Sequence, residues 1–242
     1  LWWLLVGSVG LIILSLFFVK KIYCLNVYTL PEVLEQQYGH SAVRIVASIL
    51  ISISWVGVIS AQIIAASKII SLIWPHDVNS ILIIVGIVFI IYTILGGQFS
   101  IIKTDMVQFA LITSAILFVS IYGLSKNCNL DRVIQSLPHD YFSFPFSKNF
   151  DFQKVFTYFL FIGSTYMIGP DIFSRIFCAK NEGVARRSLL ITSFILLIIA
   201  FSIVTIGILA KYSYPHISPE TALPYYVMKM LPPIITEFMI VA

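Results

Sequence analysis

The chain reads Gly96-Gly97-Gln98-Phe99-Ser100-Ile101-Ile102-Lys103-Thr104-Asp105-Met106-Val107-Gln108, and an apolar run follows over residues 109–119. A carboxylate at the mouth of a spanning helix is costly to keep near lipid, so Asp105 is expected to meet a cation, a proton or a partner. The alternative is that Asp105 caps the N-terminus of that helix, where a negative charge is favoured.

The composition of the whole chain points to a membrane protein. Of its 242 residues, 59% are hydrophobic and only 11% are charged, and the mean hydropathy is +0.98. The apolar segments reach the roughly 20 residues that a bilayer crossing needs, and they lack the period-two alternation of a transmembrane barrel. We therefore predict an all-α polytopic membrane protein whose principal partner is the lipid bilayer.

Charge and side-chain chemistry argue against several other classes. The net charge of +4 comes without a basic cluster interleaved with exposed aromatics, so no nucleic-acid partner is expected. The three cysteines and four histidines have no metal-ligand spacing, and the apolar runs hold no nucleophile–base pair. We therefore expect neither a structural metal site nor an enzyme.

The apolar runs predict six spans and the start of a seventh, all in one transmembrane domain over residues 1–242. The runs fall at about 2–19, 43–73, 79–95, 105–123, 153–175, 188–211 and 234–242. The 43–73 run is longer than a perpendicular crossing needs, so we expect it to tilt or to extend past the membrane. Both ends of the chain lie inside apolar runs, so we expect a piece of a longer protein.

Lysine and arginine residues in the short loops predict the orientation in the membrane. We place the set that lies in the shorter loops in the cytoplasm, as expected for a multi-pass protein of the plasma (inner) membrane. That set is Lys20, Lys21, Arg44, Lys103, Arg175, Lys180, Arg186 and Arg187. The loops at 124–152 and 212–233 are then external. Thr29, with Pro31 two residues on, predicts the start of a short cytoplasmic helix.

The fifth run is interrupted at its centre by Gly163-Ser164-Thr165-Tyr166-Met167-Ile168-Gly169-Pro170-Asp171. Glycine, proline and hydroxyl side chains weaken a helix, so we expect a break within 163–170 that interrupts the helix through residues 165–168. An ordinary proline kink is the alternative. A discontinuous helix would present backbone groups, together with Ser164, Thr165, Tyr166 and Pro170, to a solute at mid-membrane.

Three other polar residues in the apolar runs enter the prediction. Asp171 and Arg175 are one helical turn apart and are expected to pair on one face. Gln62 lies in the second run, where such a side chain is more often a contact between helices than a ligand. We retain Gln62 as a minor candidate for substrate binding.

Four segments together resemble the sodium:solute symporter family. They are Tyr28-Thr29-Leu30-Pro31-Glu32-Val33-Leu34-Glu35-Gln36-Gln37-Tyr38-Gly39, Tyr92-Thr93-Ile94-Leu95-Gly96-Gly97 with Thr104-Asp105-Met106-Val107-Gln108, Gly169-Pro170-Asp171-Ile172-Phe173-Ser174-Arg175, and the stretch from Pro224 to Pro233. They are similar, in order, to the family's cytoplasmic T-L-P-E signature, its Y-T-x-x-G-G…T-D-x-x-Q pattern, the end of its broken helix and its external helix. Gln37 and Lys103 depart from the Arg and Trp that are usual at those positions.

The resemblance implies an inverted-repeat (5+5 helix) fold of the leucine-transporter type. This chain would cover core helices two to seven and the first part of eight. Core helix one and most of helix eight, which build the family's principal sodium site, would lie outside it. The resemblance also implies a further ion site on core helix five, with Asp105 as its carboxylate. Asp105 and Gln108 are three residues apart, so both could face the sodium path.

The resemblance further implies a sodium-coupled symporter, with Na+ as the coupling ion, that imports a small organic solute such as the amino acid proline. Tyr166 and Pro170 match substrate contacts of the proline-transporting branch, whereas Ile162 and Val58 replace aromatic residues of that branch. The alternative is a transporter-like sensory input module of a membrane histidine kinase. A soluble extension downstream in the complete gene would distinguish that alternative.

Overall fold

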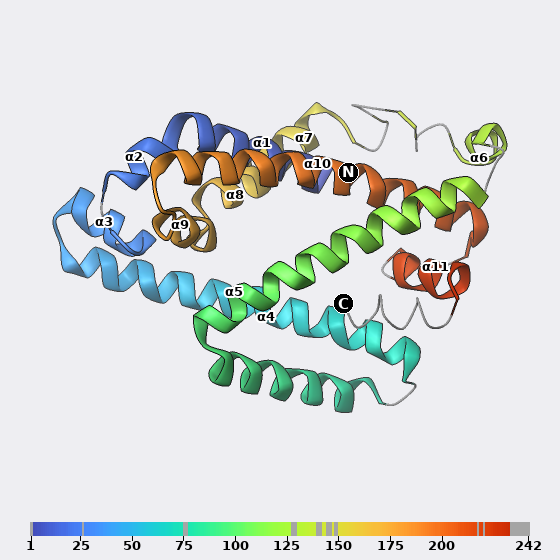
Figure 1. Ribbon diagram of the computed structural model, residues 1–242, viewed down its shortest axis with the longest axis horizontal. Helices are drawn as coiled ribbons and strands as arrows, with labels where there is room; N and C mark the ends of the chain where they lie inside the picture. Colours follow the sequence, from blue (N-terminus) through green and yellow to red (C-terminus); the bar gives the residue numbers. More distant parts are fainter. Residues whose placement is uncertain are drawn as a thin grey trace. The chain divides into compact units, whose positions relative to one another are not determined.

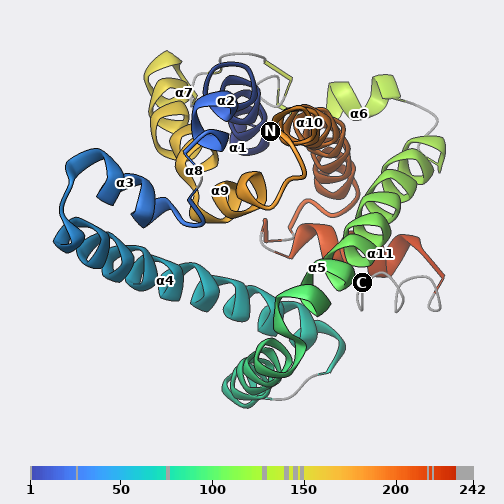
Figure 2. The same ribbon diagram turned by 60° about the vertical axis from the view of Figure 1, so that its left-hand side comes forward.

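The computed structural model describes residues 2–25, 27–74, 77–126, 130–138, 142–143, 147, 150–216, 218–219 and 221–232. The expected seventh span at 234–242 lies outside these residues. Apart from an isolated bridge between Ser147 and Phe150, the regular elements of the described part are all helices (Figure 1, Figure 2). The prediction of an all-helical protein is confirmed.

Five helical stretches of the described residues are long and apolar enough to cross a membrane: Trp2–Tyr23, Ser41–Ser71, Val78–Leu95, Lys103–Lys126 and Glu182–Ser213. The first consists of α1 (Trp2–Ile13), the π-helical turn η1 (Leu14–Phe18) and α2 (Val19–Tyr23). The second lies in α4 (Ser41–Ile73), and the last is α10 (Glu182–Ser213). The chain is therefore a polytopic membrane protein, as predicted.

The third and fourth predicted spans lie in a single helix, α5 (Val78–Lys126). The loop that we expected between them is wrong, because residues 96–104 remain helical. Residues 78–126 include no proline, and an interior glycine costs a helix only about 1 kcal/mol, so the backbone hydrogen bonds continue. Within α5 the two membrane-length stretches remain separate, at Val78–Leu95 and Lys103–Lys126, close to the predicted runs 79–95 and 105–123.

The fifth apolar run is a series of short helices. It comprises α7 (Phe152–Tyr158), the π-helical turn η3 (Phe159–Gly163), α8 (Ser164–Ile168) and α9 (Pro170–Phe177). The helical conformation stops at Gly169 alone. The break thus falls within residues 163–170, as predicted. Residues 165–168, however, form most of α8, so the expectation that the interruption runs through them is wrong.

The short helix α3 (Leu30–Tyr38) begins where the sequence indicated. Thr29 is its N-cap residue and Pro31 lies in its first turn, although the Thr29 side chain makes no capping hydrogen bond. The carboxylate of Glu32 instead accepts a hydrogen bond of 2.8 Å from the backbone N–H of Tyr28, the residue before the cap. The start of α3 is therefore fixed by the third residue of the helix.

The end of α3 is tied to the beginning of α4. Gly39 follows α3 with φ of 72°, a left-handed conformation that favours glycine. Arg44 of α4 then lies 3.5 Å from a Glu32 oxygen and 3.3 Å from a Glu35 oxygen. Two further helices, α6 (Leu130–Ser136) and α11 (Ala222–Met230), lie in the loops that we expected to be external.

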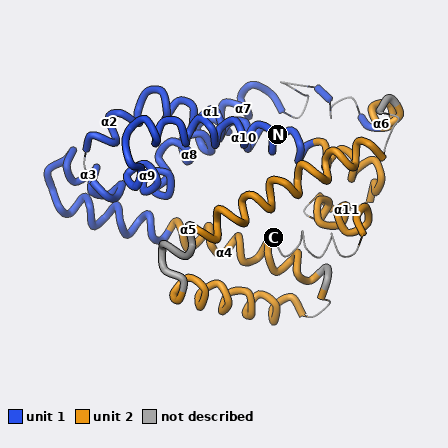
Figure 3. The backbone as a smooth tube through the Cα atoms, in the orientation of Figure 1, with its two compact units in different colours: residues 1–53, 137–204 blue, residues 54–136, 205–242 orange. Residues whose placement is uncertain are grey.

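The chain forms two compact units, residues 1–53 with 137–204 and residues 54–136 with 205–242 (Figure 3). In the first unit, side chains from the first transmembrane stretch, α9 and α10 pack into one core. Its buried residues are Leu11, Leu14, Val19, Ile22, Phe173, Ile176, Ala185 and Leu189. In the second unit, Tyr226 of α11 is fully buried, and a Cβ on Gly123 of α5 would lie 2.9 Å from the Tyr226 hydroxyl and 2.9 Å from the Leu209 side chain.

In the first unit, α1 and α10 pack as antiparallel neighbours. The buried Ser8 and Ser193 hydroxyls are 2.6 Å apart, and each hydroxyl also lies 2.9 Å from the other residue's carbonyl oxygen. About two helical turns after Ser8, the Ser15 hydroxyl donates a hydrogen bond of 3.1 Å to the Arg186 carbonyl, which lies about two turns before Ser193. Small residues and hydroxyl groups of this kind are how membrane helices associate in the absence of a hydrophobic driving force.

The other side of α1 lies very close to η3 and α8, two parts of the fifth run, which we call the broken helix (α7, η3, α8 and α9). A Cβ built on Gly10 would lie 2.8 Å from the carbonyl oxygen of Gly163, and one on Gly7 would lie 2.8 Å from the ring of Tyr166. Val6 in turn approaches Gly163, with 3.1 Å between the Val6 side chain and a Cβ on that glycine. The absence of side chains at these three glycines lets α1 lie directly against η3 and α8.

Gly10→Ala is expected to lower the thermal unfolding temperature of the full-length protein in detergent. The new methyl group meets the backbone at Gly163, which cannot rotate away as a side chain can, so the helices must separate. Gly57→Ala on α4 is the matched control, because nothing lies within 4 Å of a Cβ at that position. Equal unfolding temperatures for the two variants would contradict the close contact.

Ser8→Ala and Ser193→Ala are expected to be non-additive. Each removes one side of the same reciprocal hydrogen bond, so the double variant should lose less stability than the two single variants together, by about 0.6 kcal/mol. Equilibrium unfolding in mixed micelles measures this coupling. Ser52→Ala provides the reference, since the Ser52 hydroxyl donates only to the Ser48 carbonyl of its own helix. Strict additivity would show that the two hydroxyls act separately.

Candidate functional site

The break in the fifth run depends on the pair Gly169-Pro170. Gly169 has φ of −57° and ψ of 129°, as expected for the residue before a proline, which disfavours the α conformation. Pro170 lacks an N–H, so it cannot complete the helical bond to the Tyr166 carbonyl. The amides of Ile172 and Phe173 both donate to the Gly169 carbonyl at 3.1 Å and so begin α9.

Only glycine fits at the break. A Cβ on Gly169 would lie 2.7 Å from the Thr165 carbonyl oxygen and 2.6 Å from a carboxylate oxygen of Asp171. The expected ion pair between Asp171 and Arg175 does not form, although both residues are described and both are exposed. The Asp171 carboxylate instead lies beside the backbone of the break.

The hydroxyls of Ser164 and Thr165 are engaged within their own helix. Ser164 donates to the carbonyls of Leu160 and Phe161, the latter at 3.1 Å, and Thr165 donates to the Phe161 carbonyl at 2.8 Å. These bonds satisfy carbonyls in the π-helical turn η3, where the ordinary bonding pattern is shifted by one residue. Each hydroxyl oxygen still has lone pairs with which it can accept a hydrogen bond or contact a cation.

Tyr166 faces α1. Its ring packs against Gly7, its Cβ approaches Gly10, and the side chain also packs against the core of the first unit. The residue is nevertheless only half-buried. One edge of the ring is therefore fixed by helix packing, while part of the side chain stays exposed.

Asp105 lies in the interior of α5, which excludes the capping alternative. The N-terminus of α5 is at Val78, where the Asp77 carboxylate accepts hydrogen bonds from the backbone N–H and the hydroxyl of Ser80 at 3.2 and 3.3 Å. Asp105 and Gln108 are both exposed and lie three residues apart on the helix. Among the described residues, Asp105 has no ion-pair partner.

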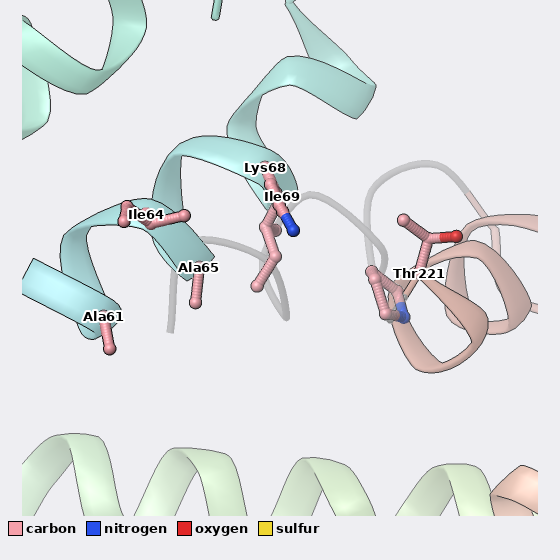
Figure 4. Close-up of a pocket in the computed structure, with 7 residues that line it drawn as sticks. Ala61, Ile64, Ala65, Lys68, Ile69 and Thr221 are labelled. Atoms are coloured by element: carbon pink, nitrogen blue, oxygen red, sulfur yellow. The ribbon is translucent and has the colours of Figure 1, made fainter. Parts of the chain in front are cut away.

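Gln62 is exposed on α4 and lies next to a pocket without lining it. The pocket has a volume of about 340 Å³ and is formed by α4 and α11 (Figure 4). Its lining residues are Ala61, Ile64, Ala65, Lys68, Ile69, Thr221 and Pro224. The walls are mostly apolar, and the Lys68 ammonium group and the Thr221 hydroxyl are the polar side-chain groups among them.

The structure groups the candidate residues within the two units. Ser164, Thr165 and Tyr166 share one helical turn in the first unit, and Pro170 follows directly after the break. Asp105, Gln108 and Gln62 belong to the second unit. The role of each candidate as a ligand stays a prediction. No group of three or more His, Cys, Asp or Glu that could hold a metal occurs among the described residues.

Sequence reasoning missed the residues that position the candidate site. Gly7 and Gly10 hold the Tyr166 ring and the η3 backbone against α1, yet neither was selected. Their signal was present, because two glycines three residues apart in an apolar run indicate a face on which helices approach closely. Asp77 was also missed as the true cap of α5.

Comparison with known proteins gives two findings. A family model described as "Sodium:solute symporter family" matches residues 1–242. The sodium/pantothenate symporter of Haemophilus influenzae (strain ATCC 51907 / DSM 11121 / KW20 / Rd) is 21% identical over 250 residues, covering 99% of this chain and 50% of that protein. The chain therefore spans about half the length of the curated relative that it matches.

Proposed function

We propose that this chain, which belongs to the sodium:solute symporter family, is part of a sodium-coupled symporter that imports a small organic solute. The family match over all of residues 1–242 is the observation that carries the proposal. The described membrane-length helices are consistent with it, since transport requires a protein that encloses a path across the bilayer. The inverted-repeat architecture of the leucine-transporter type belongs to the same proposal.

The broken helix is the candidate solute site. Secondary transporters expose backbone groups of discontinuous helices to their substrates near mid-membrane. Here the break at Gly169-Pro170 leaves the Tyr166 carbonyl without its usual helical donor, and the half-buried Tyr166 ring lies one turn before the break. Tyr166 would contact the solute with its free edge, and the oxygens of Ser164 and Thr165 would accept hydrogen bonds from it.

Asp105 is the candidate residue for sodium. Its charge lies inside α5, at the start of the membrane-length stretch Lys103–Lys126, where neither capping nor an ion pair with a described residue accounts for it. An exposed carboxylate on such a helix would attract Na+ and pass it along the path, and Gln108 could offer its amide oxygen on the same side. Each sodium ion that enters would contribute about 2.3 kcal/mol per 100 mV of membrane potential.

Uptake measurements with individual compounds would identify the solute. Proline is our initial candidate, on the strength of Tyr166 and Pro170. The H. influenzae relative is a sodium/pantothenate symporter, so pantothenate is the second compound to test. Full-length protein reconstituted into vesicles should accumulate its solute only when a sodium gradient points inward. Uptake that is unchanged when potassium replaces sodium would contradict the proposal.

Asp105→Asn is expected to raise the sodium concentration needed for half-maximal uptake by the full-length protein. The amide keeps the size of the side chain and removes the charge, so the attraction for Na+ should weaken while the amount of folded protein stays the same. Asp105→Glu retains the charge and should be milder. Asp77→Asn is the control, because it removes a carboxylate from the start of the same helix. A wild-type sodium dependence for Asp105→Asn would overturn the assignment.

Tyr166→Phe is expected to raise the KM for the solute several-fold and to leave the sodium dependence near wild type. The ring would still pack against Gly7, so protein stability should be retained, and only the contact made by the hydroxyl is removed. Tyr158→Phe, earlier in the same run, provides the matched control. A KM that moves equally in both variants would show that Tyr166 is only a packing residue.

A further inference from the structure

One end of the first unit carries exposed positive charge from three parts of the chain. These residues lie on α2, on α9 with the turn that follows it, and on the second turn of α10. We call them the basic end: Lys20, Lys21, Arg175, Lys180, Arg186 and Arg187. All six side chains are exposed, and within the described residues none of them forms an ion pair.

Hydrogen bonds between the helices bring the three parts of the basic end together. The Tyr23 hydroxyl at the end of α2 lies 3.4 Å from the Ala179 carbonyl and 3.3 Å from the Lys180 carbonyl. The Ser15 hydroxyl reaches the Arg186 carbonyl. The six cations are therefore held at the same end of the unit by contacts between the helices that carry them.

The same helices bury the neighbours of these cations in one core. The buried Val19 and Ile22 flank Lys20 and Lys21 on α2, and the four residues are consecutive. On α9 and α10, Ile176 and Ala185 are buried beside Arg175 and Arg186 in the same way. Because the buried neighbours all point into one core, the cations are directed outward around it.

Exposed apolar side chains adjoin the basic end on two helices. Leu16 and Phe17 of η1 are 46% and 67% exposed and precede Lys20 by four and three residues. On α10, Ile191 and Phe194 are 60% and 64% exposed, four and seven residues beyond Arg187 and on the same helix face. We call these two sets the apolar strips: Leu16 with Phe17, and Ile191 with Phe194. Each strip has a basic residue at one end, Lys20 for the first and Arg187 for the second.

The lengths of the helices place the cations at the membrane boundary. The 32 residues of α10 extend over roughly 48 Å, whereas the hydrocarbon core of a bilayer is about 30 Å thick. Residues 188–210 of α10 carry no charged side chain and extend over roughly 35 Å, enough to cross that core, so the charged first two turns of α10 are expected at its boundary. Glu182 and Asp171 are the acidic residues on these elements, so the six cations outnumber the acids by four.

We propose that the basic end binds an anionic phospholipid, with its headgroup on Lys20, Lys21 and the arginines of α10 and its acyl chains along the exposed apolar strips. Charge complementarity selects an anionic over a zwitterionic lipid, since clustered Lys and Arg beside a membrane helix attract anionic headgroups. The adjacent apolar strips favour a lipid over free phosphate, because a free phosphate has no chains to bury there. The proposal does not depend on the transport function.

The test is a titration of the purified full-length protein with fluorescently labelled phosphatidylglycerol in zwitterionic micelles. Lys20→Gln combined with Lys21→Gln should raise the dissociation constant about ten- to thirtyfold, the factor expected for two cations near an anionic headgroup. Lys20→Arg combined with Lys21→Arg keeps both charges and should bind like wild type. Arg186→Gln combined with Arg187→Gln is an independent second pair, which tests the other strip if the first pair fails to fold.

Lys126→Gln combined with Lys229→Gln is the matched control. It removes two exposed lysines of the second unit, which lie over the rings of Tyr122 and Tyr225. An equal rise in the dissociation constant for this pair would overturn the proposal, as would tight binding of labelled phosphatidylcholine. Inorganic phosphate should not compete at equal concentration, and full displacement by it would show a simple anion site.

Discussion

The close approach of α1 to the π-helical turn η3 is the contact on which the first unit depends. Gly10 lies against the Gly163 carbonyl so tightly that no side chain fits between them. In a membrane, two apolar helices gain nothing from exchanging lipid for each other unless their surfaces fit closely. The glycines supply that fit on one side of α1, and the reciprocal hydrogen bonds of Ser8 and Ser193 supply it on the side that meets α10. Both neighbours of α1 are thereby positioned by small residues.

That packing makes the break in the neighbouring helix tolerable. The hydrocarbon core offers no water to unpaired carbonyls, so an interrupted helix must satisfy its backbone internally. Here the hydroxyls of Ser164 and Thr165 donate to carbonyls of η3, and the Gly169 carbonyl accepts two amides of α9. The interruption is consequently confined to one residue. A local break with few unsatisfied groups is the form in which a membrane protein can keep polar backbone available to a solute.

Charged side chains occur in three distinct arrangements over the described chain. Asp105 is a single exposed carboxylate on a long apolar helix, whereas the cations of the basic end gather at helix ends of the first unit. Arg44 shows a third pattern, because it is paired with Glu32 and Glu35 and so fixes the turn between α3 and α4. The unpaired groups are the ones for which an external partner must be sought: an ion for Asp105 and a lipid headgroup for the lysines and arginines.

The sequence by itself determined the class of the protein, its family and most of its membrane-length helices, because apolar length and composition are direct consequences of the bilayer. It also placed the weak point of the fifth run near Gly169-Pro170, since proline and its preceding residue restrict the backbone locally. Only the tertiary structure decided that residues 96–104 stay helical, that Asp105 is not a cap and that Ser164 and Thr165 bond to their own helix. It also decided that Gly7 and Gly10 hold Tyr166. These outcomes depend on which helices lie side by side and on how each backbone group is satisfied, and a pattern of residues along one chain does not contain that information.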